Sequence, residues 1–145
     1  MTFSELLHEQ SDSIIREALA AVDRCGLRHY REPDHTRQRM KALLVLTQRA
    51  LRDRNLGPML AHAETIAGER FQAGFDLSEV QTAFNVLEEV IWKRIVKHLP
   101  PDQFADAFGM LSTVLGAGKD ALACAYVSLA SRSKVTSLDL EELFH

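Results

Sequence analysis

The sequence has few of the residues on which several specialised protein classes depend. Its two cysteines, Cys25 and Cys124, stand too far apart for a C-x-x-C zinc motif, so we interpret both as reduced, small apolar residues. A redox-sensing role for either stays open. No apolar run approaches the roughly 18 residues of a membrane-spanning helix, and no basic segment followed by an apolar core indicates a signal peptide. These absences predict a cytoplasmic protein that contacts no membrane.

Positive charge is also in short supply. The chain has 17 lysines and arginines against 20 acidic residues, and its formal charge of -3 argues against a general polyanion binder. Basic residues do gather along one stretch, which we interpret as the solvated face of a helix. They include Arg37, Arg39, Lys41, Arg49, Arg52 and Arg54. With 46% apolar and 26% charged residues, the 145-residue chain has the composition and length of one globular domain.

Three helices are predicted in the first half of the chain. The motif Thr2-Phe-Ser-Glu5 matches an S/T-x-x-E capping box, and the apolar residues after it recur every three or four positions up to a stop at Gly26. The second helix is expected over Pro33–Asp53, with the proline in its first turn. The third is expected to begin at Pro58 and end at Gly74.

Two longer helices are predicted in the second half. Asp76 and Glu79 have the spacing of a capping pair, and the helix after them has so wide an apolar stripe that we expect it at the centre of the domain. Pro100 and Pro101 end it. The last long helix has apolar residues at alternating steps of four and three, which is heptad spacing. These residues are Phe104, Phe108, Leu111, Leu115, Gly118, Leu122, Ala125 and Leu129.

A second stripe of smaller residues runs beside this heptad stripe, so the last long helix has two apolar faces. One face can pack on the core while the other meets a second chain; burial of both faces in one protomer is the alternative. The candidate dimerisation or docking face consists of Leu115, Gly118, Leu122, Ala125 and Leu129. After a polar break at Ser131–Ser137, Leu138–Phe144 is predicted to form a short final helix, and residues 136–145 are a candidate separate tail.

The sequence contains no catalytic motif and no metal-binding constellation. Its six histidines are scattered singly, and neither a G-x-S-x-G motif nor a phosphate-binding glycine loop is present, so we expect no enzyme and no cofactor. His62 is the one candidate phosphoacceptor, because its surroundings loosely resemble a histidine-containing phosphotransfer domain. Glu64 and Thr65 stand where such domains place a lysine and its neighbours, and an acidic neighbour repels phosphate.

Two further binding functions are alternatives to weigh. A helical domain of this length could be a haem-binding globin, with His62 or His98 as the residues to consider, although neither has a convincing partner. A helix-turn-helix could be drawn with Gly74 at its turn. Its second helix would present three acidic residues and no arginine to the phosphates, so nucleic-acid binding is not expected.

The helix order and the helix junctions resemble the N-terminal domain of RsbR-type stressosome proteins, a co-antagonist family. A connector with Tyr30 follows the first helix, and the second helix runs into Leu56-Gly-Pro-Met-Leu60. An alanine-rich helix ends in Arg70-Phe-Gln-Ala-Gly74. The next helix opens with Leu77-Ser-Glu-Val80 and continues Ala83-Phe-x-x-Leu87 before the long last helix. The similarity extends over roughly residues 5–130.

This resemblance implies a globin-like, non-haem sensor fold, here an all-α bundle of five main helices plus a short C-terminal helix. It also implies a homodimeric, non-catalytic module of stress signalling that docks to a protein partner such as a STAS or kinase component. The family usually carries a STAS or other output domain after this module. Since this chain ends soon after its last long helix, we expect either a segment of a longer protein or a stand-alone module.

Overall fold

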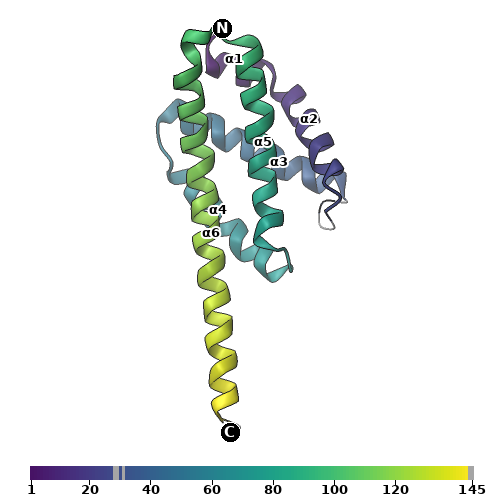
Figure 1. The fold of residues 1–145 in the computed structure, drawn as a ribbon, viewed down its shortest axis with the longest axis vertical. Coiled ribbons are helices and arrows are strands. Elements are labelled where there is room, and N and C mark those ends of the chain that lie inside the picture. Colours follow the sequence, from purple (N-terminus) through teal and green to yellow (C-terminus); the bar gives the residue numbers. More distant parts are fainter. Residues whose placement is uncertain (28–29, 31, 144–145) are drawn as a thin grey trace.

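The computed structural model describes residues 1–27, 30 and 32–143, with the backbone alone for residues 134–143. Within this part of the chain the secondary structure is six α-helices, with 3₁₀ conformation at Tyr30 and over Pro101–Gln103, and without a strand. This confirms the all-α class. The elements are α1 (Phe3–Glu9), α2 (Ser11–Arg24), α3 (Pro33–Asp53), α4 (Gly57–Gln72), α5 (Leu77–His98), η2 (Pro101–Gln103) and α6 (Phe104–Leu143) (Figure 1).

The longest helix, α6, organises the bundle. It packs against both α4 and α5, while α2 packs against α3 and α5. Figure 1 shows α5 and α6 running in opposite directions along the long axis of the molecule, with the last turns of α6 projecting past the other helices. One helix therefore belongs both to the core of the bundle and to the projecting end.

The helix starts predicted after Thr2 and Asp76 are confirmed. The Thr2 Oγ1 atom accepts a hydrogen bond from the Glu5 N–H at 3.1 Å, and α1 begins directly after Thr2. At the start of α5, the Asp76 N–H donates to Glu79 Oε1 at 3.1 Å. Each pair occupies backbone groups that the first turn of a helix leaves without partners, and each places a carboxylate at the positive end of the helix dipole.

The predicted stop at Gly74 is confirmed as well. Gly74 has a φ of +84°, and the two hydrogen bonds of a Schellman motif surround it. The Phe75 N–H donates to the Arg70 carbonyl at 3.0 Å, and the Gly74 N–H donates to the Phe71 carbonyl at 3.2 Å. A glycine is suited to this position because a side chain in the left-handed region is strained. The chain reverses here and leads directly from α4 into α5.

The prediction of one continuous first helix is wrong. The helix is interrupted at Gln10, whose φ of −104° and ψ of 14° lie outside helical values, so α1 and α2 are separate. The polar side chains here have partners other than the helix backbone. Ser11 Oγ donates to the His8 carbonyl at 3.2 Å, and the Arg94 Nη1 group of α5 donates to Gln10 Oε1 at 2.7 Å. Such polar side chains compete with the regular helical ladder.

The prediction of a polar break and a short final helix also differs from the structure. The α6 helix is continuous from Phe104 to Leu143, so Ser131–Ser137 does not interrupt it. This stretch contains neither glycine nor proline, and polar residues alone remove no backbone hydrogen bond. The structure thus also has six helices in the described part of the chain, but with different boundaries from those predicted. The predicted first helix is divided into α1 and α2, and the predicted last two helices are one helix, α6. Phe144, the end of the expected final helix, lies outside the described residues.

The helices α4, α5 and α6 pack most closely in the core around Gly118. A Cβ atom placed on Gly118 would lie 2.8 Å from Phe84 Cε1 of α5 and 3.1 Å from Met59 Sδ of α4. Both neighbours are at most 1% exposed, so neither can move into solvent. The three helices approach this closely only because residue 118 has no side chain.

We expect Gly118→Ala to destabilise the fold by about 1–3 kcal/mol, because the new methyl group overpacks the core. The matched control is Gly116→Ala on the same helix, where a Cβ would meet nothing within 4 Å. That change should instead stabilise by up to about 1 kcal/mol, since alanine favours a helix interior over glycine. Urea unfolding measures both, and a stabilising Gly118→Ala would contradict the close contact.

Candidate functional site

The structure places the predicted docking face of α6 largely inside the protomer. Leu115 and Leu122 are fully buried, and Gly118 packs against α4 and α5. Ala125 and Leu129, further along the helix, are half-buried. The predicted docking face therefore packs on the core along the body of the bundle. Ala125 is partly buried but still packs against that core, so Leu129 is the position of this face most accessible to a second chain.

A small cavity lies between α3, α4 and α5. Its volume is about 230 Å³. Its walls combine apolar side chains with a few polar and charged ones. It is lined by Tyr30, Gln38, Arg39, Ala42, Leu43, His62, Ile66, Glu69, Arg70, Val80, Ala83 and Phe84. Most of the lining is apolar, and convergent polar groups in such a lining are typical of a ligand-binding site.

Two arginines from different helices converge at this cavity. Arg39 of α3 and Arg70 of α4 both lie against the ring of Phe75, with their Cζ atoms 5.4 Å and 5.6 Å from the ring centre. Phe75 itself is buried at the junction between α4 and α5. A cation over an aromatic ring is attracted by the ring's quadrupole, so Phe75 helps to hold the two guanidinium groups of this cavity's lining in place.

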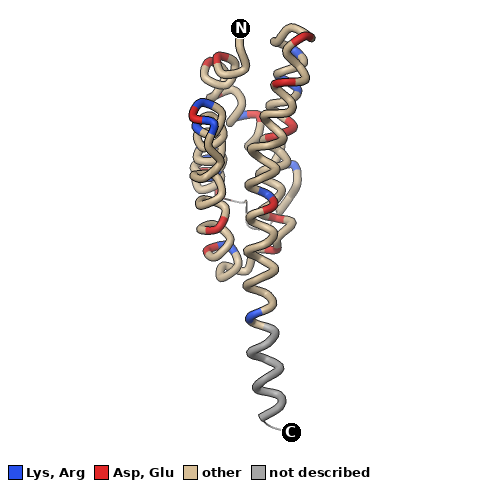
Figure 2. Tube along the Cα trace, turned by 90° about the vertical axis from the view of Figure 1, so that its left-hand side faces the viewer, with Lys and Arg blue, Asp and Glu red and all other residues tan. Residues whose placement is uncertain are grey.

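Neither arginine is fully neutralised there. The Arg70 side chain is 15% exposed, and its ion pair is with Glu69 at 3.5 Å, whose own side chain is 63% exposed. Within the described part of the chain no carboxylate comes within 4.0 Å of Arg39. Elsewhere the two signs of charge are interspersed along the helices (Figure 2). The cavity thus combines an apolar lining with excess positive charge.

Burial and mutual repulsion both act on these groups. The pKa of Arg70 is lowered, first by burial and then by the charge of Arg39. The pKa of His62 is also lowered, again first by burial and then by Arg70. The neutral form of His62 is therefore favoured beside the arginines. An anion placed in the cavity would offset the repulsion between the two guanidinium groups.

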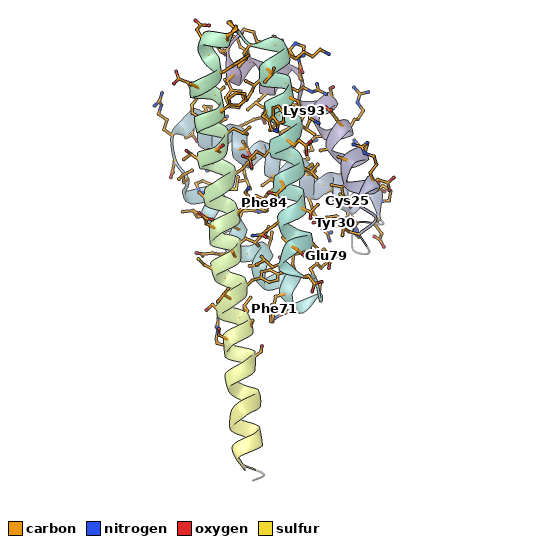
Figure 3. The ribbon with its side chains drawn as sticks, in the orientation of Figure 1. Cys25, Tyr30, Phe71, Glu79, Phe84 and Lys93 are labelled. Atoms are coloured by element: carbon orange, nitrogen blue, oxygen red, sulfur yellow. The ribbon has the colours of Figure 1, made fainter. Side chains whose placement is uncertain are left out.

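Two tyrosines attach the same junction to the rest of the bundle. The Tyr30 hydroxyl donates to the Glu79 carbonyl at 2.6 Å, and the Tyr126 hydroxyl of α6 donates to the Phe75 carbonyl at 3.2 Å. Figure 3 shows Tyr30 and Glu79 next to each other. The ring of Tyr30 also packs edge-on against Phe75, with centroids 6.3 Å apart. The wall of the cavity is consequently connected to α6.

A comparison with protein families decides what kind of domain this is. The sequence matches the family described as RsbT co-antagonist protein rsbRD N-terminal domain over residues 5–133. The chain belongs to this family. The RsbRD N-terminal domain is a regulatory module of RsbR-type stress signalling, and the match indicates no catalytic family. The family implies stressosome proteins as partners. Neither the curated proteins nor the solved structures contain a match to the chain.

Other surface hollows of this RsbRD N-terminal domain are weaker candidates for a binding site. A hollow of about 600 Å³ between α2 and α5 is rich in basic residues, but Arg94 in it already pairs with Glu17 and Lys93 pairs with Glu89. An apolar hollow of about 300 Å³ beside α6 contains Arg54 as its charged residue. In the described ranges no three His, Cys, Asp or Glu side chains gather to hold a metal, and no helix is long and apolar enough to cross a membrane.

The histidines and cysteines singled out from the sequence are separated in space. His62 lies in the cavity, partly buried beside Arg70, whereas His98 is exposed at the end of α5. Cys25 and Cys124 are free thiols, and both are exposed rather than packed as small apolar residues. The structure brings His62 together with two arginines and a tyrosine, and it leaves the other candidates apart. Phosphotransfer at His62 stays an untested prediction.

Sequence reasoning misses the pairing of Arg39 with Arg70. In the sequence Arg39 belongs to a basic stretch that predicts a solvated face, yet it is half-buried at the cavity. Arg70 stands in the junction before Gly74 without a role of its own. The periodicity of α3 does contain a signal, since Arg39 sits next to the buried Met40 and four residues before the buried Leu43. This periodicity gives no information about which residue of α4 lies near Arg39.

We expect the stability of the fold to decline at alkaline pH as the buried Tyr30 ionises. Burial raises the pKa of Tyr30 from 10.0 to about 12, partly offset by Arg39 and Arg70. The folded state thus favours the neutral hydroxyl, and this share of the stability is fully present below pH 10.0 and lost as the pH rises through about 12. Tyr30→Phe should lose about 1 kcal/mol at neutral pH with its hydrogen bond, and should weaken the alkaline decline.

The measurement is urea unfolding at a series of pH values, with Tyr126→Phe as the matched control. The pKa of Tyr126 is raised as well, by burial, but the control leaves Tyr30 in place and should keep most of the decline. Parallel alkaline declines in the wild type and in Tyr30→Phe would contradict the assignment.

Proposed function

We propose that this chain is a non-catalytic sensor module of globin-like, non-haem type, which dimerises and docks to a protein partner in the cytoplasm, such as a STAS or kinase signalling component. A binding event in the bundle would be transmitted along α6. The observation that carries the proposal is the double role of α6, which closes the core at Gly118 and then projects past the bundle (Figure 1). Membership in the RsbRD N-terminal domain family supports a signalling role.

Two connections between the cavity and α6 support transmission. Phe84 lines the cavity and is also the side chain nearest to Gly118 of α6. Phe75, the ring beside Arg39 and Arg70, accepts the Tyr126 hydrogen bond through its carbonyl. A shift of either aromatic residue would therefore act directly on α6. Tightly packed contacts pass on such small shifts because they leave little free volume to absorb them.

The size of the cavity supports a non-haem module. Pockets for drug-sized ligands have volumes of about 300–1,000 Å³. The cavity beside His62 measures about 230 Å³, which is small for a porphyrin.

The proposed dimer seam is narrower than the whole heptad stripe. The first helix, α1, contributes no large apolar side chain to the seam, because Phe3, Leu6 and Leu7 are buried inside the protomer. The seam therefore rests on the end of the stripe, at Leu129 of α6 and the partly exposed side of Ala125, which also packs against the core. Positions four apart lie on one side of a helix. The described part of α6 between Asp120 and Arg132 contains no charged residue, as Figure 2 shows, which suits contact with a second copy.

We expect Leu129→Glu to dissociate the dimer, because it places a carboxylate in an apolar seam. The dissociation constant should rise at least about 100-fold, which corresponds to roughly 3 kcal/mol. Sedimentation equilibrium at several concentrations measures the change. The wild type should sediment as a dimer at micromolar concentration.

The matched control is Val127→Glu, which introduces the same charge two residues earlier. Val127 is 62% exposed, and two residues turn about 200° around a helix, so its side chain points away from Leu129. This variant should remain dimeric. A wild type that is monomeric at high micromolar concentration, or dissociation by Val127→Glu alone, would overturn the proposed seam.

A further inference from the structure

We propose that the cavity between α3, α4 and α5 binds a small organic carboxylate with a compact apolar ring, and that Arg39 and Arg70 recognise its carboxylate. The proposal gives a ligand class to the sensor module proposed above, and it rests on that function for its signalling consequence alone. Binding itself requires the cavity of one protomer, not the dimer seam.

The charge of the cavity selects an anion. Arg39 and Arg70 reach the same ring, Phe75, from two helices, and repulsion between them is part of what lowers the pKa of Arg70. The guanidinium group is planar and presents its donors in a fork that matches a carboxylate. Glu69, the carboxylate paired with Arg70, is mostly exposed, so the pair of arginines retains excess positive charge. A bound carboxylate would neutralise it.

The lining selects the body of that anion. Ile66 of α4 and Val80 and Phe84 of α5 contribute apolar surface to the lining, and the small side chain of Ala42 of α3 adds to it. Phosphate or sulfate would leave this surface without a partner and would gain nothing from its burial. A ligand with an apolar group buries that surface while its carboxylate meets the arginines.

The volume of the cavity limits the size of the ligand. A cavity of about 150 Å³ in a protein core holds one benzene ring. The present cavity, at about 230 Å³, has room for such a ring and a carboxylate, and it has no room for a long chain or a nucleotide. Benzoate is therefore a suitable probe, since it combines one ring with one carboxylate.

A purely structural role for the two arginines is the alternative. Cation–π contacts with Phe75 alone would explain why they lie at the junction. Such a role requires no space beside them and no apolar walls facing that space. The alternative also predicts that removing either arginine changes stability and that the wild type does not bind benzoate. Stability and binding are therefore measured separately.

The test is isothermal titration calorimetry of the full chain with benzoate, together with benzamide and inorganic phosphate. We expect saturable binding of one benzoate per protomer. Benzamide has the same shape without the charge, and phosphate has charge without the ring, so each should bind at least about tenfold more weakly. Equal binding of benzamide would overturn recognition of the carboxylate, and equal binding of phosphate would overturn recognition of the ring.

Glutamine variants of the two arginines test whether benzoate binds in this cavity. Arg39→Gln and Arg70→Gln should each weaken benzoate binding at least about tenfold, as expected for loss of a charged hydrogen bond. The matched control is Arg37→Gln, because Arg37 is exposed on the opposite side of α3 and loses the same charge. A loss for Arg37→Gln equal to that for Arg39→Gln would indicate unspecific attraction and would overturn the site.

A variant that keeps both arginines covers the case in which the glutamine variants unfold. Ala42→Phe places a ring in the cavity and should abolish benzoate binding, while circular dichroism and urea unfolding report that the fold is intact. Unchanged binding by folded Ala42→Phe, or no saturable binding of benzoate by the wild type, overturns the proposal. Sedimentation tests the dimer separately: a monomeric wild type that binds benzoate contradicts the seam and leaves the cavity site standing.

Discussion

The bundle depends on the absence of a side chain at Gly118. The Phe84 ring of α5 and the Met59 side chain of α4 occupy the space that a Cβ there would need. Because both are buried, the spacing of α4, α5 and α6 is set by this contact rather than by adjustable surface residues. The same Phe84 ring forms a wall of the cavity, so the position of α6 and the shape of the cavity are physically linked.

The junction between α4 and α5 adds the second link. Gly74 reverses the chain and places Phe75 inside the bundle, where Arg39 and Arg70 approach its ring and Tyr126 bonds to its carbonyl. The left-handed conformation at Gly74 thus determines where two cations meet. The proposed sensor role would use this arrangement, because the element that would meet a ligand also contacts the helix that would carry the response.

Several elements are predictable because their causes are local. Capping at Thr2 and Asp76, the stop at Gly74 and the ends of α3 depend on residues a few positions apart. The break at Gln10 is not predictable in this way, because its side chain is held by Arg94 from a distant helix. The continuation of α6 is mispredicted for a local reason. Its polar residues suggest a break, although none of them prevents a helix.

The amino-acid sequence by itself determined the all-helical class, most helix ends and, through the junction motifs, the family, because capping and periodicity act within one or two turns. Only the tertiary structure decided that the heptad stripe of α6 packs on its own core, and that Arg39 and Arg70 share one cavity. The physical reason is that periodicity specifies which side of a helix is buried without specifying its neighbour. The neighbour is chosen by close packing of whole helices, here around Gly118.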